Sequence, residues 1–189
     1  MRNHHRRIAL ALLALTLCSL PFAQGLAWKV SGPGTVVRGT FSDAGVTFKA
    51  PDGFVLQGIT RGAAADEIVM EGPKDINGFI PAIHVQLLKE PIVLDSRGAG
   101  ADLDFVASAL GGTNSLCLVD ERTEVNGTDA IRRIIFYNLS DKRMGVLCRY
   151  LYNLDGVGVM ADYRARTATR SLPDDLAAMP ALVGSLRFE

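Results

Sequence analysis

Alternating apolar and polar positions predict a series of β-strands in the first half of the chain. In the stretch GVTFKAPDGFVLQGI, residues 45–59, two alternating runs are separated by Pro-Asp-Gly at 51–53. Because proline presets φ and glycine accepts a positive φ, this tripeptide predicts a tight turn. Further strands are expected over 54–60, 67–71 and 81–88.

The second half of the chain predicts two long β-hairpins. Asn-Gly at 126–127 and Asp-Gly at 155–156 are dipeptides that favour two-residue hairpin turns. The strands that they join are expected over 116–125 with 128–137, and over 146–153 with 157–166. The run AIRRIIFY, residues 130–137, is apolar at both parities, so this strand is expected to be covered on both faces.

Two helices are expected beside the strands. One covers about residues 103–110 with Asp102 as its cap, and the other covers 173–183. Ser171 and Asp174 have the spacing of a capping box, and Pro180 is expected to bend or end this second helix. The pattern predicts an α+β fold, with a curved antiparallel β-sheet flanked by helices.

The order of these elements resembles the PsbP-like family, which includes PsbP, DcrB and the MOG-type Ran-binding proteins. The stretches that carry the resemblance are GVTFKA, PDGF, PAIHVQLL and the closing SLRF, and together they span about residues 44–188. Phe54 stands where many members carry tryptophan. The resemblance implies a PsbP-like α/β/α sandwich that binds other macromolecules, and it carries over no shared catalytic residue.

The N-terminal segment predicts export. A basic start at 1–7 precedes the apolar run IALALLALTLCSL, residues 8–20, and small residues follow. Cleavage is expected after Ala27, with Ala23 and Gly25 as alternatives. The run is shorter than the roughly 20 residues of a membrane-spanning helix, and Leu17 before Cys18 does not suit lipidation.

The predicted organisation is therefore a signal peptide at 1–27, a leader at 28–43 and one domain at 44–189. Because the signal segment holds three of the 20 basic side chains and no acids, 17 basic and 20 acidic side chains remain, a net charge of −3. This balance argues against nucleic-acid binding, for which a basic stripe is expected. The predicted location is periplasmic or secreted, with at most peripheral contact with a membrane.

Candidate catalytic residues are few. His84 is the one histidine after cleavage, and on its strand it shares a face with Gln86. It is interpreted as a strand residue, since a catalytic histidine needs an orienting partner. The glycine-bearing stretch 97–101 is interpreted as a loop, because the rest of a phosphate-binding pattern is missing. No catalytic residue, cofactor or metal site is predicted.

The two cysteines of the mature chain are predicted not to form a disulfide with each other. Cys117 and Cys148 lie in the strands before and after the strand 128–137. If both strands pair with that middle strand, about 9.5 Å separates them. A disulfide needs Cα atoms within about 7 Å.

The two hairpin turns set a register that pairs opposite charges. Glu121 then faces Arg132, Asp120 faces Arg133, and Arg149 faces Asp162. We take Glu121, Arg132, Arg149 and Asp162 as a candidate docking row on the sheet. The alternative is a solvated patch of salt bridges, which contribute little to stability.

The predicted function is that of a non-enzymatic binding or assembly factor with a protein partner in the cell envelope. One alternative is a carrier of a small apolar ligand between sheet and helix. The other is a hydrolase that uses His84. The identity of the partner, the oligomeric state and the register between the two hairpins are left open by the sequence.

Overall fold

A computed structural model describes residues 29–31, 36–41, 44–94 and 98–189. The predicted signal peptide lies outside these residues. The main element is a seven-stranded antiparallel sheet with the order β4-β5-β6-β10-β9-β8-β7. Its strands are β4 (Val55–Arg61), β5 (Ala65–Glu71), β6 (Ala82–Leu88), β7 (Thr113–Val125), β8 (Thr128–Asn138), β9 (Met144–Leu154) and β10 (Val157–Arg166).

A smaller sheet has the order β1-β2-β3-β11. Its strands are β1 (Lys29–Ser31), β2 (Val36–Phe41), β3 (Ala44–Lys49) and β11 (Arg187–Phe188). The segment 28–43, expected as a leader, thus contributes two strands, because β2 pairs along its whole length with β3. The predicted turn at 51–53 is present, with Gly53 at φ 81° and the Phe54 N–H donating to the Pro51 carbonyl at 3.2 Å. It connects the two sheets, so the strands on either side of it are not a hairpin.

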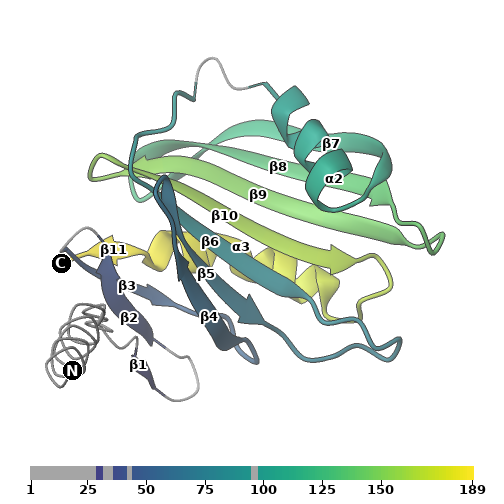
Figure 1. Ribbon diagram of the computed structural model, residues 1–189, viewed down its shortest axis with the longest axis horizontal. Helices are drawn as coiled ribbons and strands as arrows, with labels where there is room; N and C mark the ends of the chain where they lie inside the picture. The colour runs from purple at the N-terminus through teal and green to yellow at the C-terminus, as the bar shows by residue number, and fades with distance from the viewer. Residues whose placement is uncertain (1–28, 32–35, 42–43, 95–97) are drawn as a thin grey trace, which may run out of the picture.

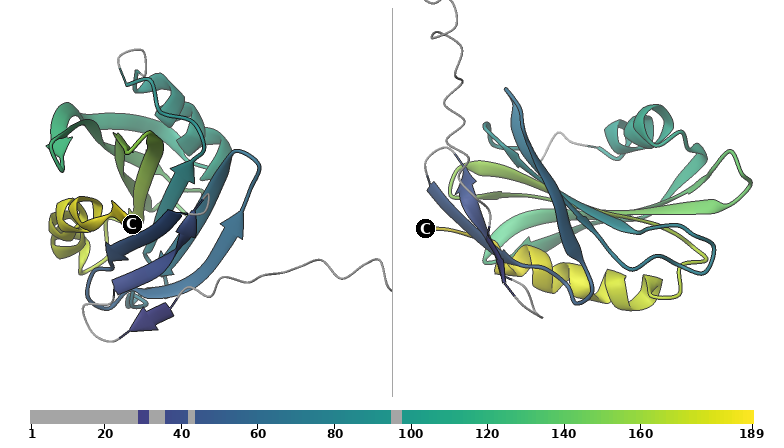
Figure 2. Two further views of the ribbon diagram at one scale, coloured as in Figure 1. Left: turned by 90° about the vertical axis from the view of Figure 1, so that its left-hand side faces the viewer. Right: turned by 60° about the horizontal axis from the view of Figure 1, so that its bottom comes forward.

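Helices lie on both faces of the large sheet, as predicted (Figure 1). Helix α2 (Gly100–Ala109) belongs to the connection from β6 to β7, which has to pass over β10, β9 and β8 because β7 is at the far edge. Helix α3 (Leu172–Ser185) covers the opposite face and leads back to the small sheet (Figure 2). The fold is the α+β sandwich that the sequence predicts.

Strand β8 is covered on both faces, as its sequence predicts. Ile134 belongs to the main core between the sheet, α3 and the small sheet. Ile135 and Tyr137 pack instead with Val106 of α2. The faces alternate along the strand because successive side chains of a β-strand point to opposite sides.

Three details of the helices differ from the prediction. Helix α2 begins at Gly100, so part of the expected glycine loop is helical, and Asp102 lies in the first turn rather than at the cap. Ser171 makes no capping hydrogen bond, because its hydroxyl donates to the Asp175 carboxylate at 2.8 Å. Helix α3 continues through Pro180 to Ser185.

Candidate functional site

Five polar residues form a row across the face of the large sheet that carries α2. The register places His84 of β6 opposite Asp162 of β10, Asp162 opposite Arg149 of β9, Arg149 opposite Arg133 of β8, and Arg133 opposite Asp120 of β7. Residues directly opposite one another share a sheet face, so all five project toward the α2 side. We call these five residues the cross-strand row.

The centre of the row places two arginines side by side. Arg133 and Arg149 face each other on neighbouring strands, and like charges in this position repel. Asp102 of α2 lies between them: its Oδ2 accepts from Arg133 Nη1 at 2.6 Å and its Oδ1 from Arg149 Nη1 at 2.7 Å. The carboxylate of Asp102 therefore compensates both guanidinium groups at once.

Further contacts fix the guanidinium of Arg149 in place. Its Nε and Nη2 donate to the two carboxylate oxygens of Asp162, both at 2.6 Å. Arg164 donates to the same carboxylate at 3.1 Å. The ring of Phe105 covers both cations, 4.4 Å from Arg149 and 5.3 Å from Arg164. Burial alone would lower the pKa of Arg149, but Asp162 and Asp102 outweigh it and raise the pKa above the usual value.

The candidate docking row of the sequence analysis is divided between the two sheet faces. All three predicted registers are confirmed, and the ion pairs Glu121–Arg132 at 3.0 Å, Asp120–Arg133 at 2.8 Å and Arg149–Asp162 at 2.6 Å are present. However, Arg149 and Asp162 are only 2% and 1% exposed beneath α2. They cannot dock a partner while α2 is in place, which corrects the expectation of one exposed row.

The other half of that row is exposed on the α3 side of the sheet. Arg132 and Glu121 alternate with the buried row residues, so they point to the opposite face. Their side chains are 33% and 49% exposed. Leu116 and Leu118 of the same edge strand are each 58% exposed. This end of the sheet therefore combines an accessible ion pair with apolar side chains.

His84, at the other end of the row, is held by a carboxylate. Its Nδ1 lies 2.9 Å from Glu67 Oε1, and the Gln86 amide donates to the same oxygen at 3.2 Å. Burial, and then the charge of Arg164, lower the pKa of His84 below its usual value, although Glu67 acts in the opposite direction. Within the described residues, no serine or cysteine is hydrogen-bonded to His84. The structure thus contains the base and the carboxylate that a hydrolase needs, without a nucleophile in contact with them.

The two cysteines flank β8, as predicted. Cys117 of β7 faces Ile135, whereas Cys148 of β9 faces Ile134. Since Ile134 and Ile135 project to opposite faces, the two thiols do so as well. Burial raises the pKa of Cys148 to about 11.

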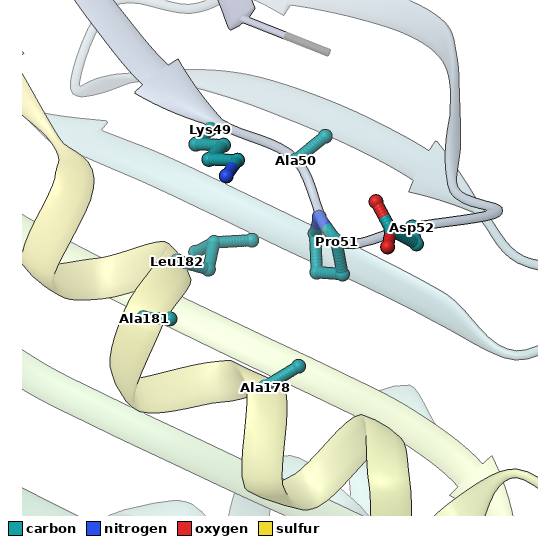
Figure 3. A pocket seen from close by; sticks show the side chains of 7 residues that line it. All are labelled: Lys49, Ala50, Pro51, Asp52, Ala178, Ala181 and Leu182. Carbon is teal, nitrogen blue, oxygen red and sulfur yellow. The ribbon is translucent and has the colours of Figure 1, made fainter. Parts of the chain in front are cut away.

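Two surface hollows bear on the carrier alternative. One, of about 180 Å³, lies between residues 49–52 and α3, and its lining includes Lys49, Asp52 and two alanines of the helix (Figure 3). The other, of about 520 Å³, is lined by residues 63–64 and 88–91, next to the β4–β5 turn. Neither is an apolar cavity between sheet and helix, which is the site that a carrier of this kind would need.

Within residues 29–31, 36–41, 44–94 and 98–189, no group of three or more His, Cys, Asp or Glu side chains is arranged to hold a metal ion. No helix within these ranges is long and apolar enough to cross a membrane.

Comparison with known proteins places the fold. No family model and no curated protein matches the chain. Among solved structures, the cyanobacterial PsbP (CyanoP) from Synechocystis sp. PCC 6803 aligns with a TM-score of 0.55 and 14% identity, over 92% of this chain and 99% of that one. The chain therefore has the PsbP-like fold that the resemblance implies.

Two other solved structures align with lower scores. The Ran-binding protein Mog1p of Saccharomyces cerevisiae has a TM-score of 0.47 and 14% identity, over 82% of this chain and 86% of that one. A Pseudomonas aeruginosa protein of unknown function, PA94, has a TM-score of 0.43 and 14% identity, over 78% of this chain and 96% of that one.

Sequence reasoning missed the role of Asp102. The sequence pattern indicates only a helix cap at Asp102. The signal that points further is the register between β8 and β9, which brings Arg133 and Arg149 together. No turn motif within either hairpin determines that register.

Proposed function

We propose that this chain is an exported, non-enzymatic binding domain with a protein partner in the cell envelope. Export is supported by the basic start and the short apolar run at 8–20, with cleavage after Ala27. A binding role is supported by the PsbP-like fold and by the buried charged residues, which bond to one another within the domain. Asp102, Arg133, Arg149 and Asp162 bind one another, which attaches α2 to the sheet.

The observation that carries the proposal is the exposed end of the sheet at β7 and β8. Leu116 and Leu118 lie on β7, the last strand of the sheet, which also carries Glu121 of the accessible ion pair Glu121–Arg132. Contiguous exposed apolar surface rimmed by polar residues marks protein interaction sites. We call Leu116, Leu118, Glu121 and Arg132 the β7–β8 surface, and propose it as the docking surface.

The test is partner retention from envelope extract, quantified by mass spectrometry. Wild type is compared with Leu116→Ser/Leu118→Ser and with Val93→Ser, a control that removes another exposed apolar side chain, 68% exposed. We expect wild type and Val93→Ser to retain the same protein, and the double variant to lose it while its melting curve stays close to that of wild type. If wild type retains nothing above empty resin, the proposed function is wrong. Equal retention by the double variant would exclude the β7–β8 surface.

The contact between His84 and Glu67 favours hydrolysis as a second candidate function. A carboxylate that orients a histidine is the arrangement of a general base. Ester and peptide substrates assayed with wild type and His84→Ala test this candidate. Turnover by wild type that disappears in His84→Ala would establish an enzyme and replace the binding proposal.

A further inference from the structure

The α2 side of strands β4, β5 and β6 is an open sheet face. Along β5 and β6, every second residue is buried in the main core, and the residues between them are only partly covered. The partly covered positions face one another in pairs: Glu67 with Gln86, Val69 with His84, and Glu71 with Ala82. Helix α2 lies over the other end of the sheet and leaves this part uncovered (Figures 1 and 2).

The hydrogen bonds among Glu67, His84 and Gln86 leave more acceptors than donors unused. Hydrogen bonds from His84 and Gln86 outweigh burial and lower the pKa of Glu67, so at neutral pH this side chain is a carboxylate that only accepts. His84 must then carry its proton on Nδ1, because this nitrogen contacts Glu67 Oε1. The remaining atoms, His84 Nε2, Gln86 Oε1 and Glu67 Oε2, are acceptors, and the Gln86 amide keeps one N–H donor.

Two carboxylates on this face lie outside the neighbouring cluster of ion pairs. That cluster joins Arg133, Arg149 and Arg164 with Asp102, Asp120 and Asp162. Glu67 contacts His84 instead, and within the described residues no ion pair of Glu71 is found. Arg164, whose charge acts on Glu67, is bound to Asp162 and covered by Phe105.

We propose that the open face of β4–β6 binds a segment of a partner protein whose arginine or lysine side chains project from one side. Guanidinium and ammonium groups carry only donors, so they complement the carboxylates of Glu67 and Glu71 and the acceptor atoms between them. A second copy of this chain is a poor occupant, because pairing the same face with itself would bring Glu67 and Glu71 against like charges. The inference rests on the proposed binding function but uses a surface other than the β7–β8 surface.

The test is an NMR titration of the mature protein with the acetylated and amidated hexapeptide Arg-Val-Arg-Val-Arg-Val. In an extended conformation its arginines share one side. The comparison peptide replaces arginine with citrulline, which keeps the shape and removes the charge. We expect the arginine peptide to shift the amide signals of β5 and β6 and the ring signals of His84, and the citrulline peptide to leave them in place. Added salt should weaken the binding.

Two variants locate the binding. Glu67→Gln should raise the dissociation constant of the arginine peptide about tenfold, the loss expected for one hydrogen bond to a charged group. Glu124→Gln removes the same charge from an exposed position on β7 and should leave the dissociation constant unchanged. Equal binding of both peptides, unchanged binding by Glu67→Gln, or shifts confined to other strands would overturn this inference. The proposed function would still stand in each of those cases if wild type retains its envelope partner.

Discussion

At the scale of single residues, the buried arginines Arg133 and Arg149 need a negative charge between them. Both are 2% exposed and they lie opposite each other, so water cannot screen their repulsion. Asp102, which is fully buried, provides the shared carboxylate. Removing one partner from a buried ion pair leaves an uncompensated charge, which costs far more than the loss of a surface ion pair.

We therefore expect Asp102→Asn to lower the free energy of unfolding by about 3–5 kcal/mol. Asp104→Asn is the matched control, because Asp104 is exposed on the same helix and its loss should change stability by less than about 0.5 kcal/mol. Urea unfolding of both variants measures the difference. A cost below about 1 kcal/mol for Asp102→Asn would show that the arginines find another partner.

The cysteines give a second prediction at this scale. Cys148 is 1% exposed and burial raises its pKa to about 11, whereas Cys117 is partly exposed on an edge strand. At pH 8 we expect a thiol reagent to modify Cys117 slowly and Cys148 only after unfolding, with two thiols counted in the unreduced, denatured monomer. A count of zero, with the mass of a monomer less two hydrogens, would contradict the strand order β7-β8-β9.

At the scale of elements, the sheet beneath α2 depends on a glycine opposite an aromatic ring. Gly145 of β9 is opposite Tyr137 of β8, and a Cβ at Gly145 would overlap that ring. Tyr137 in turn packs against Val106 and Leu147 in the small core under α2. The absence of a side chain at position 145 therefore makes the space that the tyrosine ring fills.

Gly145→Ala should lower the free energy of unfolding by about 1–3 kcal/mol, because overpacking forces the ring or the strand to move. Gly58→Ala, on edge strand β4, is the control: an added Cβ there meets no heavy atom within 4 Å. Thermal melts of the two variants, compared with wild type, make the measurement. Similar melting temperatures for both would show that Tyr137 can move out of the way without cost.

Local signals account for the elements that the sequence predicts correctly. Asn-Gly and Asp-Gly turns determine the register within each hairpin, so the pairs Glu121–Arg132 and Arg149–Asp162 follow from the turns alone. The pairings of β8 with β9 and of β6 with β10 are not adjacent to such a turn, and the cross-strand row depends on both. For this reason the sequence predicts Arg149 and Asp162 as part of an exposed row, although they are buried under α2.

At the scale of the whole molecule, two antiparallel meanders form one sheet through the pairing of β6 with β10. Helix α2 lies in the connection from β6 to β7 on one face of this sheet, and α3 lies in the connection from β10 to β11 on the other face (Figure 2). The alternation of apolar residues predicts strands and helices, and it predicts that β8 is covered twice. It does not predict strands β1 and β2, which lie in the expected leader, or that β3 belongs to a separate sheet, since the pattern of β3 is equally suitable for either sheet.

Export is the prediction that belongs to this scale. We expect mass spectrometry of the protein purified from its native envelope to find an N-terminus between Gln24 and Trp28, because the basic start and the apolar run direct secretion and cleavage. A retained Met1, or a diacylglyceryl group on Cys18, would contradict the proposed processing.

The shared carboxylate of Asp102 also has an evolutionary consequence. As long as Arg133 and Arg149 face each other in the fold, a descendant that loses Asp102 gains from replacing either arginine with an apolar residue, and the order of these substitutions matters. Losing Arg149 first leaves Asp102 bound to Arg133 but removes the two-bond partner of buried Asp162, whereas losing Asp102 first leaves two adjacent cations. The three positions should therefore change together or not at all. Among related sequences, they should stay the same over greater divergence than the exposed pair Glu121–Arg132, whose members can change one at a time.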